Sequence, residues 1–160
     1  MQTITAQKSE ITTVIIVRHA EKDSSAENQQ PAEMTGQQDV KLTERGEQRA
    51  VLLADMLDKS GVSAVFSTNT TRTIETVNNY ADKSGLEINF YDDLGDLTEK
   101  IFSDYRGDKI LVSAHSNTIG PLMKALGADS VPQIDHDYYS GFFIVTLAPG
   151  GSVSWLHLEY

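Results

Sequence analysis

The chain has 160 residues, a length that suits one domain with a substantial hydrophobic core. Its formal net charge of -10 argues against nucleic acid or an anionic membrane as a general partner, because both are bound through basic surfaces. The sequence contains no cysteine, which excludes disulfides, thiol catalysis and thiolate metal sites.

The first element that we expect is a buried, parallel strand. Residues 14–17 are Val-Ile-Ile-Val, a run of β-branched residues typical of a strand that is covered on both faces. We expect residues 1–12, which precede it, to be mostly flexible. The polar residues 23–41 include proline and glycine, and they predict a mobile loop. Between strand and loop lies "RHAEK" (18–22), which places four ionisable residues within five positions.

The middle of the chain alternates helices and strands. Thr43 can cap a helix whose apolar face repeats at helical spacing, through Ala50, Leu53, Ala54 and Leu57. Residues 62–67 predict a second strand, and residues 70–83 predict a second helix. A short strand over 86–91 and a helix over 95–104 follow.

The last third of the chain predicts a buried strand, a helix and a hairpin. "KILVSAH" (109–115) is the strand, and the helix after it is marked by Ile119, Leu122, Met123 and Leu126. Residues 142–148 and 152–160 predict two strands joined by a tight turn at "PGG". This order of elements indicates one α/β domain over residues 1–160. We expect a three-layer sandwich with a mostly parallel sheet, helices on both faces and an antiparallel edge strand near the C-terminus.

Three of the predicted strands end in groups that can bind phosphate. Arg18 and His19 follow the first strand, Arg72 lies near the start of a helix, and His115 follows a buried strand. Because ligands of such sheets bind beyond the carboxyl ends of the strands, we expect these side chains to converge. Arginine binds phosphate oxygens in bidentate fashion, helix N-termini offer free N–H groups, and a neutral histidine can act as a nucleophile. The pattern therefore favours phosphoryl transfer.

Four segments in this order resemble the histidine phosphatase superfamily, also called phosphoglycerate-mutase-like. They are "VIIVRHAEK" (14–22), "LTERGEQRA" (42–50), "FSTNTTRTIETV" (66–77) and "ILVSAHSNTIG" (110–120). Together they resemble a small, bacterial-type, single-domain member. A lone Arg-His pair would be weak evidence, whereas four segments in the family's order are strong.

The resemblance implies a phosphatase, a phosphoric monoester hydrolase that needs no metal and no cofactor. His19 would carry the phosphoryl group as phosphohistidine, which water would then hydrolyse. Arg18, Arg72 and His115 would complete the phosphate pocket. The substrate would be a small phosphomonoester or a phosphohistidine on another protein. A mutase is disfavoured, because the chain is short for the segments with which mutases enclose their substrate.

Other candidate residues follow from the neighbourhood of these motifs. Ser116 and Asn117, at the start of the predicted helix after His115, are further candidates for substrate binding. Many members of the family carry an asparagine six residues after the nucleophile, and Ser25 occupies that position here.

The proton donor to the leaving group is not fixed by the motifs. In many members an acidic residue lies between the arginine helix and the second histidine, where this chain has Asp92 and Asp93. Glu21 lies close to the nucleophile in sequence. We favour Asp92 or Asp93 over Glu21.

Two other kinds of function remain open from the sequence. A metallohydrolase would use imidazole and carboxylate ligands, drawn from His19, Glu21, His115 and His136. Arg18 and Arg72 oppose it, because cations beside a metal cost energy. The other alternative is a phosphate-binding or interaction module without turnover. We assign the side chain of His136 to a solvated loop and that of His157 to a structural role.

The sequence also carries a prediction about location. No stretch approaches the roughly 18 apolar residues that span a bilayer, and the first residues lack the apolar region of a signal peptide. We expect a cytoplasmic protein, or an exported, periplasmic one if a leader was removed. The sequence does not predict an oligomeric state.

Overall fold

The computed structural model describes residues 10–25 and 39–160. These residues form a six-stranded sheet with the order β3-β2-β4-β1-β5-β6. The strands are β1 (Thr12–Arg18), β2 (Ala64–Ser67), β3 (Ile88–Phe90), β4 (Lys109–Ala114), β5 (Gly141–Leu147) and β6 (Val153–Glu159). The helices are α1 (Glu44–Leu57), α2 (Thr71–Ser84), α3 (Leu94–Asp104) and α4 (Ser116–Ala125).

The sheet is parallel in its first part and antiparallel at one edge. β3, β2, β4 and β1 are parallel neighbours, while β5 runs antiparallel to β1 and β6 runs antiparallel to β5. The hairpin turn between β5 and β6 contains Gly150 and Gly151, both at positive φ, a conformation that glycine adopts without strain. The predicted mostly parallel sheet with an antiparallel C-terminal edge is confirmed.

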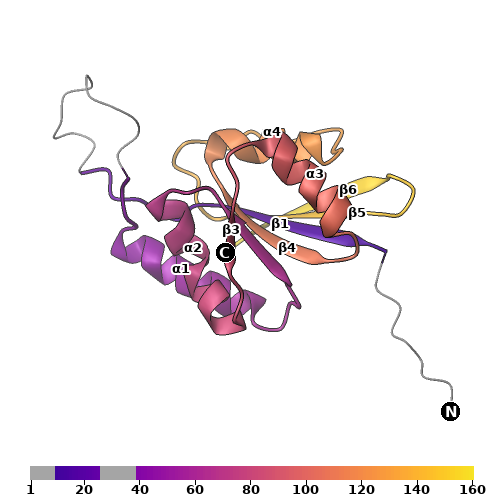
Figure 1. Cartoon of the computed structure of the whole chain (residues 1–160). Coiled ribbons are helices and arrows are strands. Elements are labelled where there is room, and N and C mark those ends of the chain that lie inside the picture. The colour runs from indigo at the N-terminus through magenta and orange to yellow at the C-terminus, as the bar shows by residue number, and fades with distance from the viewer. Residues whose placement is uncertain (1–9, 26–38) are drawn as a thin grey trace, which may run out of the picture.

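Two layers of helices cover the two faces of the sheet (Figure 1). Leu53 and Leu57 of α1 and Val77 of α2 pack with Val17 and Leu111 on one face. On the other face, the buried residues of α3 and α4 pack against the sheet; they are Leu97, Ile101, Ile119, Leu122 and Met123. The predicted three-layer α/β sandwich is therefore confirmed.

The two segments that we expected to be flexible fall largely outside the described residues. Of residues 1–12, the structure describes Glu10 and its successors, and Thr12 already begins β1. Of the loop 23–41, residues 26–38 lie outside the described part of the chain.

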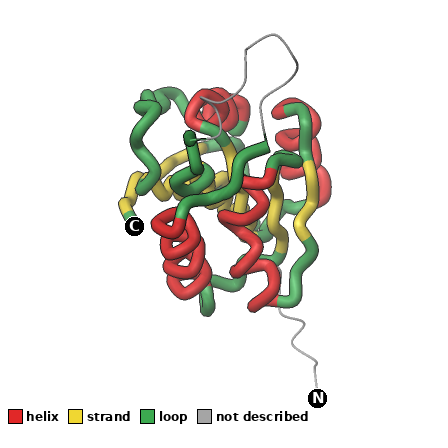
Figure 2. The backbone as a smooth tube through the Cα atoms, turned by 90° about the vertical axis from the view of Figure 1, so that its left-hand side faces the viewer, coloured by secondary structure: helices red, strands yellow, loops and turns green. Residues whose placement is uncertain are grey.

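The register of the sheet brings three strand ends to one edge. Arg18 of β1 lies opposite Ala114 of β4, and Ser67 of β2 lies opposite Ser113 of β4. Figure 2 looks onto this edge, where the loops that follow the strands come together. The residues that follow β1, β2 and β4 are therefore neighbours in space, as the sequence predicted for a ligand-binding edge.

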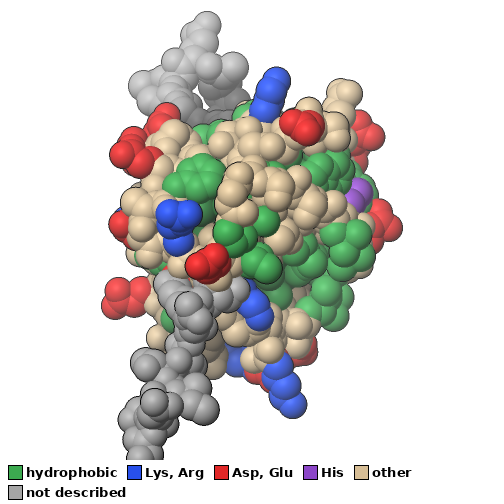
Figure 3. All heavy atoms as spheres, turned by 90° about the vertical axis from the view of Figure 1, so that its right-hand side faces the viewer, with side chains coloured by type: hydrophobic (Ala, Val, Ile, Leu, Met, Phe, Trp, Pro, Cys, Tyr) green, Lys and Arg blue, Asp and Glu red, His purple; other side chains and the backbone are tan. Residues whose placement is uncertain are grey.

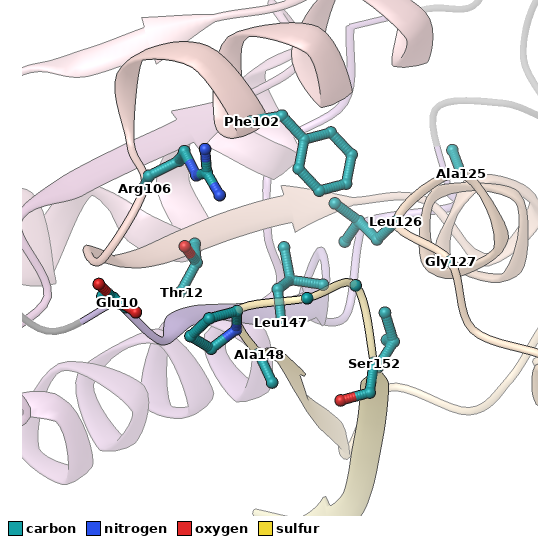
Figure 4. Close-up of a pocket in the computed structure, with 14 residues that line it drawn as sticks. Glu10, Thr12, Phe102, Arg106, Ala125, Leu126, Gly127, Leu147, Ala148 and Ser152 are labelled. Atoms are coloured by element: carbon teal, nitrogen blue, oxygen red, sulfur yellow. The ribbon is translucent and has the colours of Figure 1, made fainter.

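A separate hollow of about 500 Å³ lies at the opposite edge, between the end of α3, the start of β1 and the β5–β6 turn (Figure 4). Its lining includes Phe102, Arg106, Leu126, Leu147 and Val153, with Glu10 at the start of β1. Figure 3 views the molecule from this side and shows exposed hydrophobic side chains between scattered charged residues.

Candidate active site

His19 lies at the end of β1 with one ring nitrogen fixed by the backbone. The side chain is buried, and the His19 N–H donates to the carbonyl of Ala114 over 2.9 Å. Nδ1 lies 2.8 Å from the carbonyl oxygen of Ala20. A carbonyl oxygen can only accept, so Nδ1 carries the hydrogen in this bond. The lone pair of the neutral ring is therefore on Nε2, the nitrogen that remains for chemistry.

The surroundings of His19 keep its ring neutral. Burial, together with the positive charges of Arg18 and Arg72, lowers the pKa of His19 to about 3. A neutral imidazole at physiological pH has an available lone pair, which is the property that a nucleophile needs.

Arg18 is held by the loop that precedes β5. Its Nη1 donates to the backbone carbonyls of His136, Tyr138 (3.0 Å) and Asp135 (3.3 Å). The ring of Tyr139 stacks on the guanidinium, with 4.0 Å between Cζ and the ring centroid. Nε of Arg18 is buried and has no hydrogen-bond acceptor. Because Nη1 is occupied, the Nε–Nη2 edge is the side of the fork that can bind an anion in bidentate fashion.

Arg72 and His19 are connected through Thr76. Arg72 lies in the first turn of α2 and is 5% exposed. The hydroxyl of Thr76, one turn later, donates to the carbonyl of Arg72 over 2.7 Å and accepts the N–H of Ala20 over 2.8 Å. This bridge fixes the start of α2 relative to the residues that follow β1.

His115 lies directly after β4, and its ring is an edge-on neighbour of His19 with 5.5 Å between the centroids. Burial and the charges of Arg72, Arg18 and Lys22 lower the pKa of His115 to about 4. Both histidines are therefore neutral at physiological pH. The structure brings together the four residues, Arg18, His19, Arg72 and His115, that the sequence placed at one edge.

The other predicted substrate-binding residues are less buried. Ser116 is half-buried and Asn117 exposed in the first turn of α4. Ser25 is exposed, and both its N–H and its hydroxyl donate to the carboxylate of Asp23.

The three candidate proton donors have different surroundings. Both carboxylate oxygens of Glu21 accept from Arg49, over 2.9 and 2.8 Å, and Arg45 adds an ion pair. Burial raises the pKa of Glu21, but the bonds from Arg49 outweigh this and hold the pKa below its usual value. Asp93 caps α3 by accepting the N–H of Asp96 over 3.0 Å. Asp92 is exposed beside it, with no printed bond on its carboxylate.

Glu21 belongs to the framework that joins β1 to α1. A Cβ at Gly46 would lie 2.3 Å from the Glu21 carbonyl oxygen, so this close approach requires glycine. The same carbonyl accepts the N–H of Thr43, whose hydroxyl caps α1. The motif "LTERGEQRA" thus contributes the residues that hold the segment after His19.

Several residues around the site were missed by the sequence reasoning. The loop 135–138 binds Arg18 through carbonyl groups, which every residue has, so its side chains gave no signal. Tyr139 stood next to the histidine that we did examine, His136, whose own side chain is exposed. Asp39 accepts from the N–H and hydroxyl of Thr71 at the start of α2, over 2.6 and 2.5 Å. Its position after a polar loop gave no reason to select it.

The metal alternative finds no matching arrangement of ligands. Within residues 10–25 and 39–160, no three carboxylate or imidazole side chains gather as a metal site would require. Glu21 is bonded to arginines, and the side chain of His136 contacts Asp137 at the surface. In the part of the chain that the structure describes, no helix is both long and apolar enough to cross a membrane.

The fold is shared with solved phosphatases at low sequence identity. The protein histidine phosphatase SixA, in complex with tungstate, matches with a TM-score of 0.70 and 18% identity, over 92% of this chain and 96% of that one. The mycobacterial glucosyl-3-phosphoglycerate phosphatase Rv2419c matches with a TM-score of 0.64 and 16% identity, over 94% and 98%. Bacillus stearothermophilus YhfR matches with a TM-score of 0.64 and 18% identity, over 89% and 94%. At these identities the matches show a common fold.

The family itself is shown by the sequence. No curated protein matches the chain significantly. The sequence model of the histidine phosphatase superfamily (branch 1) matches residues 14–98, more than half of the chain, and this range includes Arg18, His19 and Arg72. The chain therefore belongs to the histidine phosphatase superfamily, and it is a phosphatase.

Proposed function

We propose that the protein hydrolyses phosphate esters or phosphohistidine without a metal, through a phosphohistidine intermediate on His19. The observation that carries the proposal is the state of His19: its Nδ1–H is bound to the Ala20 carbonyl, and the ring is neutral. This combination leaves Nε2 unprotonated in a pocket that contains two buried arginines.

In the first step the Nε2 lone pair attacks phosphorus and the bond from phosphorus to the leaving group breaks. The phosphorylated ring carries a positive charge, which the Ala20 carbonyl stabilises through Nδ1–H. The Nε–Nη2 edge of Arg18, the Arg72 guanidinium and the start of α4 stabilise the negative charge on the phosphoryl oxygens. In the second step water attacks phosphorus, the P–N bond breaks, and inorganic phosphate leaves with neutral His19 restored.

We assign the proton for the leaving group to Asp92. Glu21 is held ionised by Arg49, and Asp93 is bound to the first turn of α3. Asp92 lies just after β3, at the same edge of the sheet as the histidines. A leaving group of low pKa, including the nitrogen of phosphohistidine, needs little protonation, so the requirement for Asp92 depends on the substrate.

The substrate is a small phosphomonoester or a phosphohistidine on a protein. The two similar structures with printed activities include one phosphatase of each kind, a protein histidine phosphatase and a glucosyl-3-phosphoglycerate phosphatase. The same scaffold therefore serves both, and the choice has to be measured.

The test is turnover of p-nitrophenyl phosphate in the presence of EDTA, combined with trapping of the enzyme in denaturant. We expect turnover that resists the chelator and a phosphoenzyme that is labile in acid and stable in base. His19→Ala should lose both, while His136→Ala, which changes an exposed histidine, should keep both. Turnover that disappears with EDTA would favour the metallohydrolase. Phosphate binding without turnover would favour a binding module.

A further inference from the structure

A threonine hydroxyl is bound to the second histidine of the site. Thr68 Oγ1 lies 2.9 Å from Nε2 of His115. The contact follows from the sheet, because Ser67 and Ser113 are paired on β2 and β4, and both chains then leave the sheet at the same edge. Nε2 is therefore occupied, and Nδ1 is the ring nitrogen of His115 that remains for a ligand.

The Thr68 hydroxyl is one member of a chain of three. Thr73 is fully buried, and its Oγ1 lies 3.0 Å from Thr68 Oγ1 and 2.7 Å from Thr70 Oγ1. Thr73 Oγ1 also lies 2.9 Å from the carbonyl oxygens of Thr68 and Thr70. The chain runs from the start of α2 to His115.

These distances allow two directions of hydrogen bonding. In one, His115 Nε2–H donates to Thr68, Thr68 donates to Thr73, and Thr73 donates to a carbonyl. In the other, Thr70 donates to Thr73, Thr73 to Thr68, and Thr68 to Nε2. Every hydroxyl hydrogen has an acceptor in both arrangements, so rotation of hydroxyls can exchange them. The first direction leaves a lone pair on Nδ1, and the second leaves a hydrogen there.

We propose that Thr68 is a positioning residue that donates to Nε2 of His115 when phosphate is bound, so that the neutral ring presents Nδ1–H to the phosphoryl group. The inference rests on the proposed function, because it assumes that a phosphoryl group occupies the pocket beside His115.

The charges around His115 explain why a hydroxyl would be used for this purpose. A histidine can also donate from Nδ1 as an imidazolium, but Arg18, Arg72 and Lys22 oppose a further positive charge. A phosphoryl oxygen accepts hydrogen bonds, so a lone pair on Nδ1 would repel it. Donation from Thr68 gives the ring an N–H toward the ligand without adding a charge.

The direct test is the protonation of the ring nitrogens. NMR of protein with 15N-labelled histidine, saturated with inorganic phosphate at neutral pH, should show His115 neutral with the hydrogen on Nδ1 and none on Nε2. The His115→Gln variant identifies the signals. A hydrogen on Nε2, or on both nitrogens, in the phosphate complex would overturn the proposal.

The functional test uses two substitutions of the same residue. Thr68→Val keeps the shape and removes the hydroxyl, whereas Thr68→Ser keeps the hydroxyl. We expect Thr68→Val to weaken phosphate binding and to lower kcat/KM about tenfold, because one hydrogen bond to the ring is lost and the tautomer is no longer selected. Thr68→Ser should remain within about twofold of wild type on the same argument.

The outcomes separate this inference from the proposed function. If wild type turns over through phosphohistidine but Thr68→Val binds phosphate normally and keeps the Nδ1–H form, the inference is wrong and the function stands. If no phosphoenzyme forms, yet phosphate still selects Nδ1–H in wild type and not in Thr68→Val, the function is wrong and the role of Thr68 stands.

Discussion

The two edges of the sheet differ in where their charged groups lie. At the edge where the parallel strands end, Arg18, His19 and Arg72 are each 5% exposed or less. At the opposite edge, Arg106 and Glu10 line a hollow of about 500 Å³, but both side chains are exposed. The buried hydroxyl among the lining residues there, that of Thr12, already accepts the N–H of Gly107 over 2.9 Å.

This difference separates the presence of a hollow from the presence of a site. An exposed arginine keeps its hydration and binds an anion weakly, because solvent screens the charge. A buried arginine has lost its hydration and interacts strongly with any anion that replaces the water. The catalytic edge is therefore defined by desolvated, convergent groups, and substitutions that are matched between the two edges can test this.

The same substitution at both edges should have the largest difference in effect. Arg18→Lys removes the bidentate edge and the fork that holds three carbonyls of the loop before β5. We expect kcat/KM for p-nitrophenyl phosphate to fall about 10²- to 10³-fold. Arg106→Lys should change it by less than about twofold, since that arginine has a solvated fork.

A comparable loss in both variants would show that the hollow at the opposite edge takes part in catalysis. Circular dichroism and thermal unfolding of Arg18→Lys are the controls, because the loop that the arginine holds contributes to the fold as well as to the site.

The proton donor can be tested along one helix, because α3 runs from one edge to the other. Asp92→Asn should lower turnover of an alkyl phosphate about 10²-fold, since a poor leaving group needs a general acid. Turnover of p-nitrophenyl phosphate should change little in the same variant. Asp104→Asn, at the far end of α3, should leave both substrates unaffected. Equal loss on both substrates would contradict a role as proton donor.

The parts of the site that the sequence predicted are those that depend on residue type and strand ends. Arg18, His19 and His115 each follow a buried apolar run, and the rule for ligand binding in α/β sheets places them together. Partners that are distant in sequence were not predictable. Glu21 and Arg49 are separated by 28 positions, and each also has unremarkable reasons to occur where it does.

The fold shows the same division. Apolar periodicity predicted each described helix and strand, with ends that differ by one to a few residues, because caps such as Thr43 and Asp93 act locally. The path of the loop before β5 depends on the carbonyl groups that surround Arg18, and no pattern of side chains encodes those.

Glu21 can be tested as a structural group against Glu10 of the opposite edge. Its side chain is 14% exposed, and that of Arg49 is 12% exposed. Glu21→Gln leaves a largely buried guanidinium without its counter-charge, and we expect a loss of about 2–3 kcal/mol in the free energy of unfolding. Glu10→Gln should change it by less than about 0.5 kcal/mol. Urea denaturation at pH 7 measures both, and an unchanged midpoint in Glu21→Gln would show that the ion pair is not stabilising.

The pH dependence of stability tests the burial of His19. Its folded pKa of about 3 lies below the ordinary value of 6.5, so between these values the unfolded chain binds a proton that the folded protein does not. Stability should therefore fall as the pH drops below 6.5, and His19 alone should account for about 2 kcal/mol between pH 7 and pH 5. His19→Gln removes this contribution, so the loss on acidification should be smaller in that variant than in wild type. His136→Gln, which changes an exposed histidine, should follow wild type. If His19→Gln also followed wild type, His19 would titrate as a solvated group, and the neutral nucleophile on which the proposed mechanism depends would lose its physical basis.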